Sequence, residues 1–156
     1  MDDDPWLDDR QQRLWRAWVA LSSQLPAALH RQLQADSGLS LQDFEVLVHL
    51  TDAADGRVRV SDLARCAGWE RSRLSHQLRR MEQRGLVERS ECSEDARGTM
   101  IALTPRGRAA LEKAAPGHVA AVRRHFVDLV EPGEVPVLAA VFRRVRDALG
   151  RSDGCG

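Results

Sequence analysis

Cysteine is scarce in this sequence, and the three cysteines, Cys66, Cys92 and Cys155, lie far apart. Their odd number and wide spacing argue against a disulfide framework and against a CxxC metal site, and they are typical of a reducing cytoplasm. No apolar run approaches the ~20 residues that a membrane-spanning helix needs, and no signal peptide is recognisable. We therefore expect a cytoplasmic protein that has no contact with a membrane.

Catalytic signatures are also absent. The chain contains no P-loop and no GxGxxG sequence. Ser75 and His76 are neighbours, but adjacent residues on a helix point about 100° apart, which does not suit a nucleophile and its base. His118 and His125 are two helical turns apart without a third ligand near them, so we expect solvated histidines. The sequence predicts no enzyme, no metal site and no cofactor.

The charge is balanced in total but unevenly distributed. The chain has 23 basic and 23 acidic residues. Residues 1–9 hold five acidic residues and no basic one, so the other 147 residues carry 23 basic and 18 acidic residues, a net charge of +5. Residues 65–84 contain six arginines and two glutamates. Such a cluster is typical of a nucleic-acid contact, although a basic face that is simply solvated is the plain alternative.

Hydrophobic periodicity predicts a mainly helical chain. A first long helix is expected from about residue 5 to residue 35. The second helix is expected over residues 41–53, capped by Ser40, with Asp43 in the acidic position of a capping box. A turn and a short extended segment follow the second helix.

A helix over residues 60–67, a turn at Gly68 and a basic helix over residues 71–84 come next. The basic helix has Leu74, Leu78 and Met81 on its inner face. The period then changes from 3.6 to 2 in residues 86–91 and 99–104, which predicts a β-hairpin with a polar loop. Helix, tight turn, basic helix and hairpin together predict a winged helix-turn-helix.

Two further helices complete the expected fold. Thr104 and Pro105 are a good helix start, because a hydroxyl cap precedes proline at the first helical position. This helix is expected to reach about residue 130, and a last helix to span about residues 134–149. Its apolar residues and those of the first helix, among them Leu14 and Trp18, recur at spacings of three and four. One compact domain does not easily cover such seams, so they favour pairing with a second copy.

The outer face of the basic helix carries donors for phosphates and for purine edges in a major groove about 12 Å wide. The N-terminus of that helix adds the positive end of its dipole. The loop of the hairpin places Arg97 where it reaches a minor groove, with Asp95 as a brace. The predicted DNA-binding residues are Arg71, Ser72, Arg73, Ser75, His76, Arg79, Asp95 and Arg97.

The sequences "MEQRGLVER" and "IALTPRG" and the DxR pair of the wing lie within residues 60–111, which resemble the DNA-binding core of MarR-type transcriptional regulators. The resemblance extends over about residues 10–149 as a single domain, with a winged helix-turn-helix core at about 40–104. It implies dimerisation helices at about 10–35 and 105–149. The acidic tail 1–9 and the tail 150–156 are expected to be flexible.

The resemblance also implies a homodimer that binds a pseudo-palindromic operator in double-stranded DNA, most often as a repressor. Two-fold pairing places two recognition helices about 34 Å apart, one turn of DNA. A constitutive regulator without a ligand, and a module that binds an acidic protein partner, are the alternatives.

Members of this family are often released from DNA by small aromatic ligands or by cysteine oxidation. The usual pocket lies between the dimerisation helices and the winged domain, and candidate lining residues are Trp15, Trp18, His49 and Trp69, with core packing as the alternative role. Cys66 is expected to be a small buried apolar residue. Cys92, near Arg89 at the base of the wing, is the candidate for oxidation.

Overall fold

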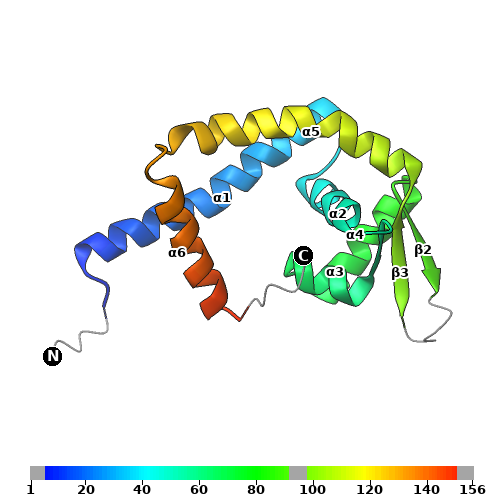
Figure 1. Cartoon of the computed structure of the whole chain (residues 1–156), viewed down its shortest axis with the longest axis horizontal. Helices are drawn as coiled ribbons and strands as arrows, with labels where there is room; N and C mark the ends of the chain where they lie inside the picture. The colour runs from blue at the N-terminus through cyan, green and yellow to red at the C-terminus, as the bar shows by residue number, and fades with distance from the viewer. Residues whose placement is uncertain (1–5, 92–97, 151–156) are drawn as a thin grey trace.

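Helices make up most of the chain that the computed structural model describes, residues 6–91 and 98–150 (Figure 1). The elements are α1 (Asp9–Ser37), α2 (Leu41–Asp52), β1 (Arg57–Arg59), α3 (Val60–Ala67), α4 (Arg71–Gln83), β2 (Val87–Glu91), β3 (Thr99–Leu103), α5 (Pro105–His125), the 3₁₀ helix η1 (Val127–Leu129) and α6 (Val135–Ala148). The strands form one antiparallel sheet in the order β1-β3-β2. The predicted winged helix-turn-helix is confirmed.

The long helices frame the winged unit. In Figure 1 α1 and α5 run side by side along the top, while α2, α3 and α4 lie beneath the start of α5, next to the hairpin of β2 and β3. Gly117 permits the close approach of α5 to α1, since a Cβ there would lie 3.1 Å from side-chain atoms of Gln32 and Asp36. The hairpin of β2 and β3 lies at the end of the molecule that also carries α4 (Figure 1).

Capping residues define where the helices begin. Ser40 and Asp43 form the predicted capping box at the start of α2, and the Thr104 hydroxyl accepts a hydrogen bond from the Gly107 amide at the start of α5. α1 begins at Asp9, not near residue 5, because the Asp8 carboxylate accepts from the amides of the first turn and forms a capping box with Gln11. Local hydrogen bonding therefore sets these boundaries.

The core fills the space between α2, α3, α4, the sheet and the adjoining ends of α1 and α5. The predicted inner residues of α4, Leu74, Leu78 and Met81, are fully buried there. The other side chains that are fully buried include Leu33, Leu39, Leu47, Leu50, Leu63 and Ile101. Burial of each large aliphatic side chain stabilises the fold by about 1.5–3 kcal/mol. Together these side chains fix the angle at which α4 is held.

Two features differ from the sequence-based expectations. α5 ends at His125, earlier than residue 130, because Phe126 leaves the helical conformation with φ −144° and ψ −64°, and the short η1 follows. Cys66 is half-buried and disulfide-bonded, so the expectation of a small buried apolar residue is wrong, and the odd number and wide spacing of the cysteines did not exclude a disulfide.

Large apolar side chains are exposed on the elements that lie away from this core. They occur on α1, on α6 and on the segment between α5 and α6. Trp18 of α1 and Phe142 of α6 lie near one another, with ring centroids 6.3 Å apart, yet both remain more than two-fifths exposed. The other exposed residues include Leu14, Trp15, Val19, Val127, Leu129, Val135, Val145 and Leu149.

Candidate nucleic-acid interface

The outer face of α4 is a row of polar side chains. Because Leu74, Leu78 and Met81 face the core, with Gln77 buried beside them, the opposite side of the helix points to solvent. Of the six residues of this helix that were predicted to bind DNA, five are exposed and Ser75 is half-buried. The exposed residues are Arg71, Ser72, Arg73, His76 and Arg79. Three of these five side chains are guanidinium groups, which suit both phosphate oxygens and guanine edges.

The N-terminal end of α4 is held by its neighbours. The guanidinium of Arg73 lies 5.3 Å from the centroid of the Trp69 ring, a cation–π contact. Trp69 itself packs against the hydrophobic core. The Ser72 hydroxyl donates to Glu70 at 3.3 Å. The turn between α3 and α4 thus orients the first residues of the exposed face.

The hairpin is joined to α4 by Arg89 of β2. Its Nη2 donates to the backbone oxygen of Ser75 at 3.0 Å, and its Nε lies 3.5 Å from Oε2 of Glu82. Arg89 therefore positions the hairpin against α4, a role that the sequence did not predict. Asp95, Arg97 and Cys92 lie outside the described residues, so the proposed roles of the wing remain predictions.

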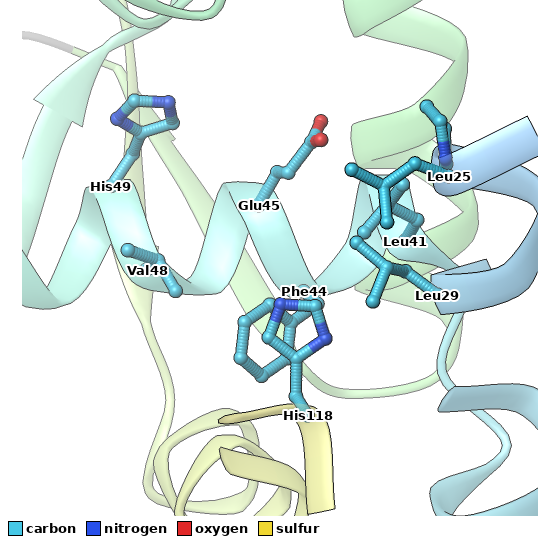
Figure 2. A pocket seen from close by; sticks show the side chains of 9 residues that line it. Leu25, Leu29, Leu41, Phe44, Glu45, Val48, His49 and His118 are labelled. Carbon is cyan, nitrogen blue, oxygen red and sulfur yellow. The ribbon is translucent and has the colours of Figure 1, made fainter. Parts of the chain in front are cut away.

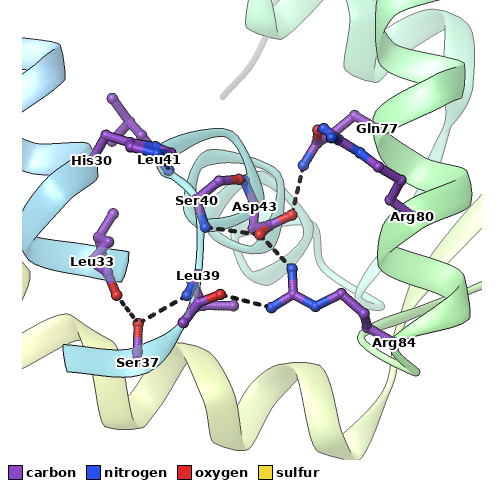
Figure 3. Close-up of polar contacts among 11 residues, drawn as sticks. His30, Leu33, Ser37, Leu39, Ser40, Leu41, Asp43, Gln77, Arg80 and Arg84 are labelled. Carbon is purple, nitrogen blue, oxygen red and sulfur yellow. Dashed lines mark hydrogen bonds and ion pairs between the residues drawn. The ribbon is translucent and has the colours of Figure 1, made fainter. Parts of the chain in front are cut away.

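A buried carboxylate ties α4 to the junction of α1 and α2 (Figure 3). Asp43 is 2% exposed and accepts hydrogen bonds from Nε2 of Gln77 at 2.6 Å and Nη1 of Arg84 at 2.7 Å. The Ser40 amide donates to it at 2.8 Å. Arg84 also donates to the Gly38 backbone oxygen at 2.9 Å. The network fixes the C-terminal half of α4, as the core fixes its inner face.

Replacing Arg84 with alanine is expected to lower the free energy of unfolding by about 2 kcal/mol, because the buried Asp43 carboxylate loses its cation. The expected loss is smaller than for a fully buried ion pair, because the Arg84 side chain is partly exposed to water, which screens its charge. Urea unfolding followed by circular dichroism measures this. The matched control is Arg108→Ala, an exposed arginine of α5, which should change stability by less than about 0.5 kcal/mol. Equal stability of the two variants would contradict the role of the network.

An apolar pocket of about 350 Å³ lies between α1, α2 and α5 (Figure 2). Burial raises the pKa of Glu45 while the Arg73 charge lowers it, and burial lowers the pKa of His118. The His118 ring lies 4.2 Å from that of Phe44, so this histidine is not the solvated residue expected from the sequence. The lining residues are Leu25, Pro26, Leu29, Leu41, Phe44, Glu45, Val48, His49 and His118.

Of the four predicted ligand residues, only His49 lines this pocket. Trp15 and Trp18 are exposed on α1, and Trp69 lies under Arg73. Sequence reasoning missed Glu45 and His118. The four-residue spacing of Glu45 and His49 was a signal for a shared face of α2, but the contribution of α5 depends on helix packing.

The sequence of this chain is similar to those of known proteins. A profile described as MarR family matches residues 37–98. The HTH-type transcriptional repressor YetL of Bacillus subtilis (strain 168) is 32% identical over 114 residues, which cover 71% of this chain and 68% of YetL.

Two solved structures are also similar along nearly their whole length. AbsC, a MarR family transcriptional regulator from Streptomyces coelicolor, is 40% identical with a TM-score of 0.88, covering 92% of this chain and 97% of AbsC. Sco3205 from the same organism, solved in complex with DNA, is 37% identical with a TM-score of 0.92, covering 98% of this chain and 96% of Sco3205.

The fold and the exposed basic helix define a DNA-binding protein of the winged helix-turn-helix class. The chain belongs to the MarR family of transcriptional regulators. Within residues 6–91 and 98–150, no helix is long and apolar enough to cross a membrane.

Proposed function

We propose that this protein is a cytoplasmic repressor that binds a pseudo-palindromic DNA operator as a homodimer. The observation that carries the proposal is the exposed face of α4, where arginines are presented on a helix that the core and the Asp43 network hold fixed. A preformed helix loses little conformational entropy when it enters the major groove. The wing, with Arg97 and Asp95, is proposed to contact the adjacent minor groove.

The homodimer is supported by the exposed apolar residues of α1 and α6. A single chain leaves these side chains in water, and a second copy related by two-fold symmetry would cover them. Two copies would present two recognition helices to successive major grooves, about 34 Å apart. Both subunits would then contribute phosphate contacts to one complex.

A small aromatic ligand is proposed to regulate this repressor from the pocket between α1, α2 and α5. The pocket is concave, is lined mostly by apolar side chains and lies within the volume range of small-molecule sites, about 300–1,000 Å³. It touches α2, which also carries Asp43 and so contacts α4. An occupant of the pocket therefore has a physical route to the DNA-binding helix.

Selection of genomic fragments on the purified full chain identifies the operator and tests the function. Specific binding should survive an excess of random duplex, because specific sites are typically ~10³-fold or more tighter than non-specific ones. Complexes that random duplex removes completely would contradict the proposal. Retention of an acidic protein instead of DNA would favour an interaction module.

Replacing Arg79 with alanine is expected to weaken operator binding by about 1–3 kcal/mol and to relax the base preference at one position, because a guanidinium pairs with a guanine edge. Competition among operators with single base changes measures both effects. Arg108→Ala on the exposed side of α5 is the control and should bind like the parent. If Arg79→Ala keeps the parent's affinity and base preference, the groove assignment is wrong.

A further inference from the structure

The carboxylate of Glu45 is the unexplained charge of the pocket. Glu45 lines an otherwise mostly apolar wall and is half-buried. Within the described residues it accepts no hydrogen bond and forms no ion pair. A half-buried carboxylate without a hydrogen bond or an ion pair lacks most of the compensation that such groups normally have. Figure 2 shows Glu45 on the same side of α2 as His49, with its carboxylate turned toward the pocket residues of α1.

The other titratable side chains that line the pocket are the imidazoles of His49 and His118. The pKa of His118 is lowered by burial, which favours the neutral imidazole. Nδ1 of His118 is buried and has no hydrogen-bond partner among the described residues. Among the described residues, the pocket is lined by the carboxylate of Glu45 and by no arginine or lysine. This composition disfavours an aromatic carboxylate and suits an apolar molecule with a positive charge.

A positive charge on the exposed face of α4 lowers the pKa of the same carboxylate, against the larger effect of burial. Arg73 is exposed at the N-terminal end of α4, and its charge acts on Glu45 through space. The two helices that carry them are joined nearby, since Asp43 lies two residues before Glu45 and Gln77 lies one turn after Arg73. The negative charge of Glu45 lowers the positive potential that Arg73 presents to a phosphate.

We propose that the pocket between α1, α2 and α5 binds an apolar amine through Glu45, and that this ligand strengthens the binding of the operator. The ammonium group of the ligand donates hydrogen bonds to the carboxylate, and its apolar body packs against Leu25, Pro26 and Leu29. With Glu45 neutralised, Arg73 attracts the DNA backbone more strongly. Binding of ligand and of operator then favour each other to the same extent. The inference rests on the proposed function and specifies its ligand class and the direction of regulation.

The ligand class is tested on the full chain without DNA. Isothermal titration calorimetry compares 2-phenylethylammonium with 3-phenylpropionate, which have similar apolar bodies and opposite charges. We expect 2-phenylethylammonium to bind and 3-phenylpropionate not to bind. Glu45→Gln should lower the affinity for 2-phenylethylammonium about tenfold, because a hydrogen bond to a charged group is lost. Asp52→Asn, which removes an exposed charge from the same helix outside the pocket, should bind like the parent. Equal binding of the two probes, or no binding of either, would overturn the ligand class.

The coupling is tested with the selected operator at low salt. We expect saturating 2-phenylethylammonium to tighten operator binding about threefold, the size typical of partly exposed charge pairs. Glu45→Gln should tighten it to a similar degree without the amine and should remove the response to the amine. Asp52→Asn should leave the operator affinity unchanged. Adding Arg73→Ala to Glu45→Gln should abolish the increase in operator affinity that Glu45→Gln alone produces. Weaker or unchanged operator binding in the presence of the amine would overturn the coupling. A parent protein that binds no operator would contradict the proposed function instead, while the calorimetry would still report on the pocket.

Discussion

Replacing Phe142 with aspartate is expected to convert the homodimer into monomers and to weaken operator binding about 100-fold, because two linked half-sites gain affinity that a single half-site lacks. Phe142 lies on the apolar face of α6, next to Trp18 of α1, and is 42% exposed in the single chain. If a second copy covers this face, the new carboxylate must be buried without a partner, at a cost of several kcal/mol. The core around α2, α3 and α4 is remote from this residue, so the monomer should remain folded.

Sedimentation velocity reports the oligomeric state, and titration of the operator reports the affinity. The control is Arg144→Asp, which places an aspartate on the same helix about 160° around the helix axis from Phe142. That variant should sediment like the parent. A Phe142→Asp protein that remains dimeric would show that this face of α6 is not the interface.

Replacing Gly107 with alanine is expected to lower the free energy of unfolding by about 3 kcal/mol, at the upper end for overpacked cores. Gly107 lies in the first turn of α5, and a Cβ there would lie 2.0 Å from the backbone oxygen of Leu86. That oxygen belongs to the segment that enters β2, so a rotating side chain cannot relieve the clash. Thr104 reinforces the contact, because its hydroxyl donates to the backbone oxygens of Gly85 and Leu86 at 2.7 and 3.0 Å.

Urea unfolding of the Gly107→Ala variant measures the loss. Gly133→Ala is the matched control, because a Cβ at Gly133 meets no atom within 4 Å and its backbone is not in the left-handed region. The control should remain within about 0.5 kcal/mol of the parent. Similar stability for both variants would mean that α5 moves away from Leu86 without cost.

The sequence predicted the DNA-binding unit well because its signals are local. Ser40 with Asp43 and Thr104 with Pro105 mark helix starts by hydrogen bonds and ring geometry within three or four residues. The spacing of Leu74, Leu78 and Met81 predicts the inner face of α4, and all three are fully buried. Once that face is known, the helical period alone places Arg79 outside.

The pocket was predicted poorly because it depends on contacts between distant segments. Trp15 and Trp18 were chosen for their aromatic rings, but both are exposed on α1, away from the pocket. Glu45 and His118 line it because α5 packs across α2, and no local pattern records how two helices cross. The buried network of Asp43, Gln77 and Arg84 joins residues 34 and 41 positions apart, which periodicity does not detect.

The sequence by itself determined the order of the helices, the hairpin, the inner face of α4 and hence the arginines that it presents, because capping and periodicity act over one or two helical turns. Only the tertiary structure decided which polar groups are buried and which charges act on one another. Desolvation and Coulomb interaction depend on distance in space, and the distance between Glu45 and Arg73 exists only after α2 and α4 have packed.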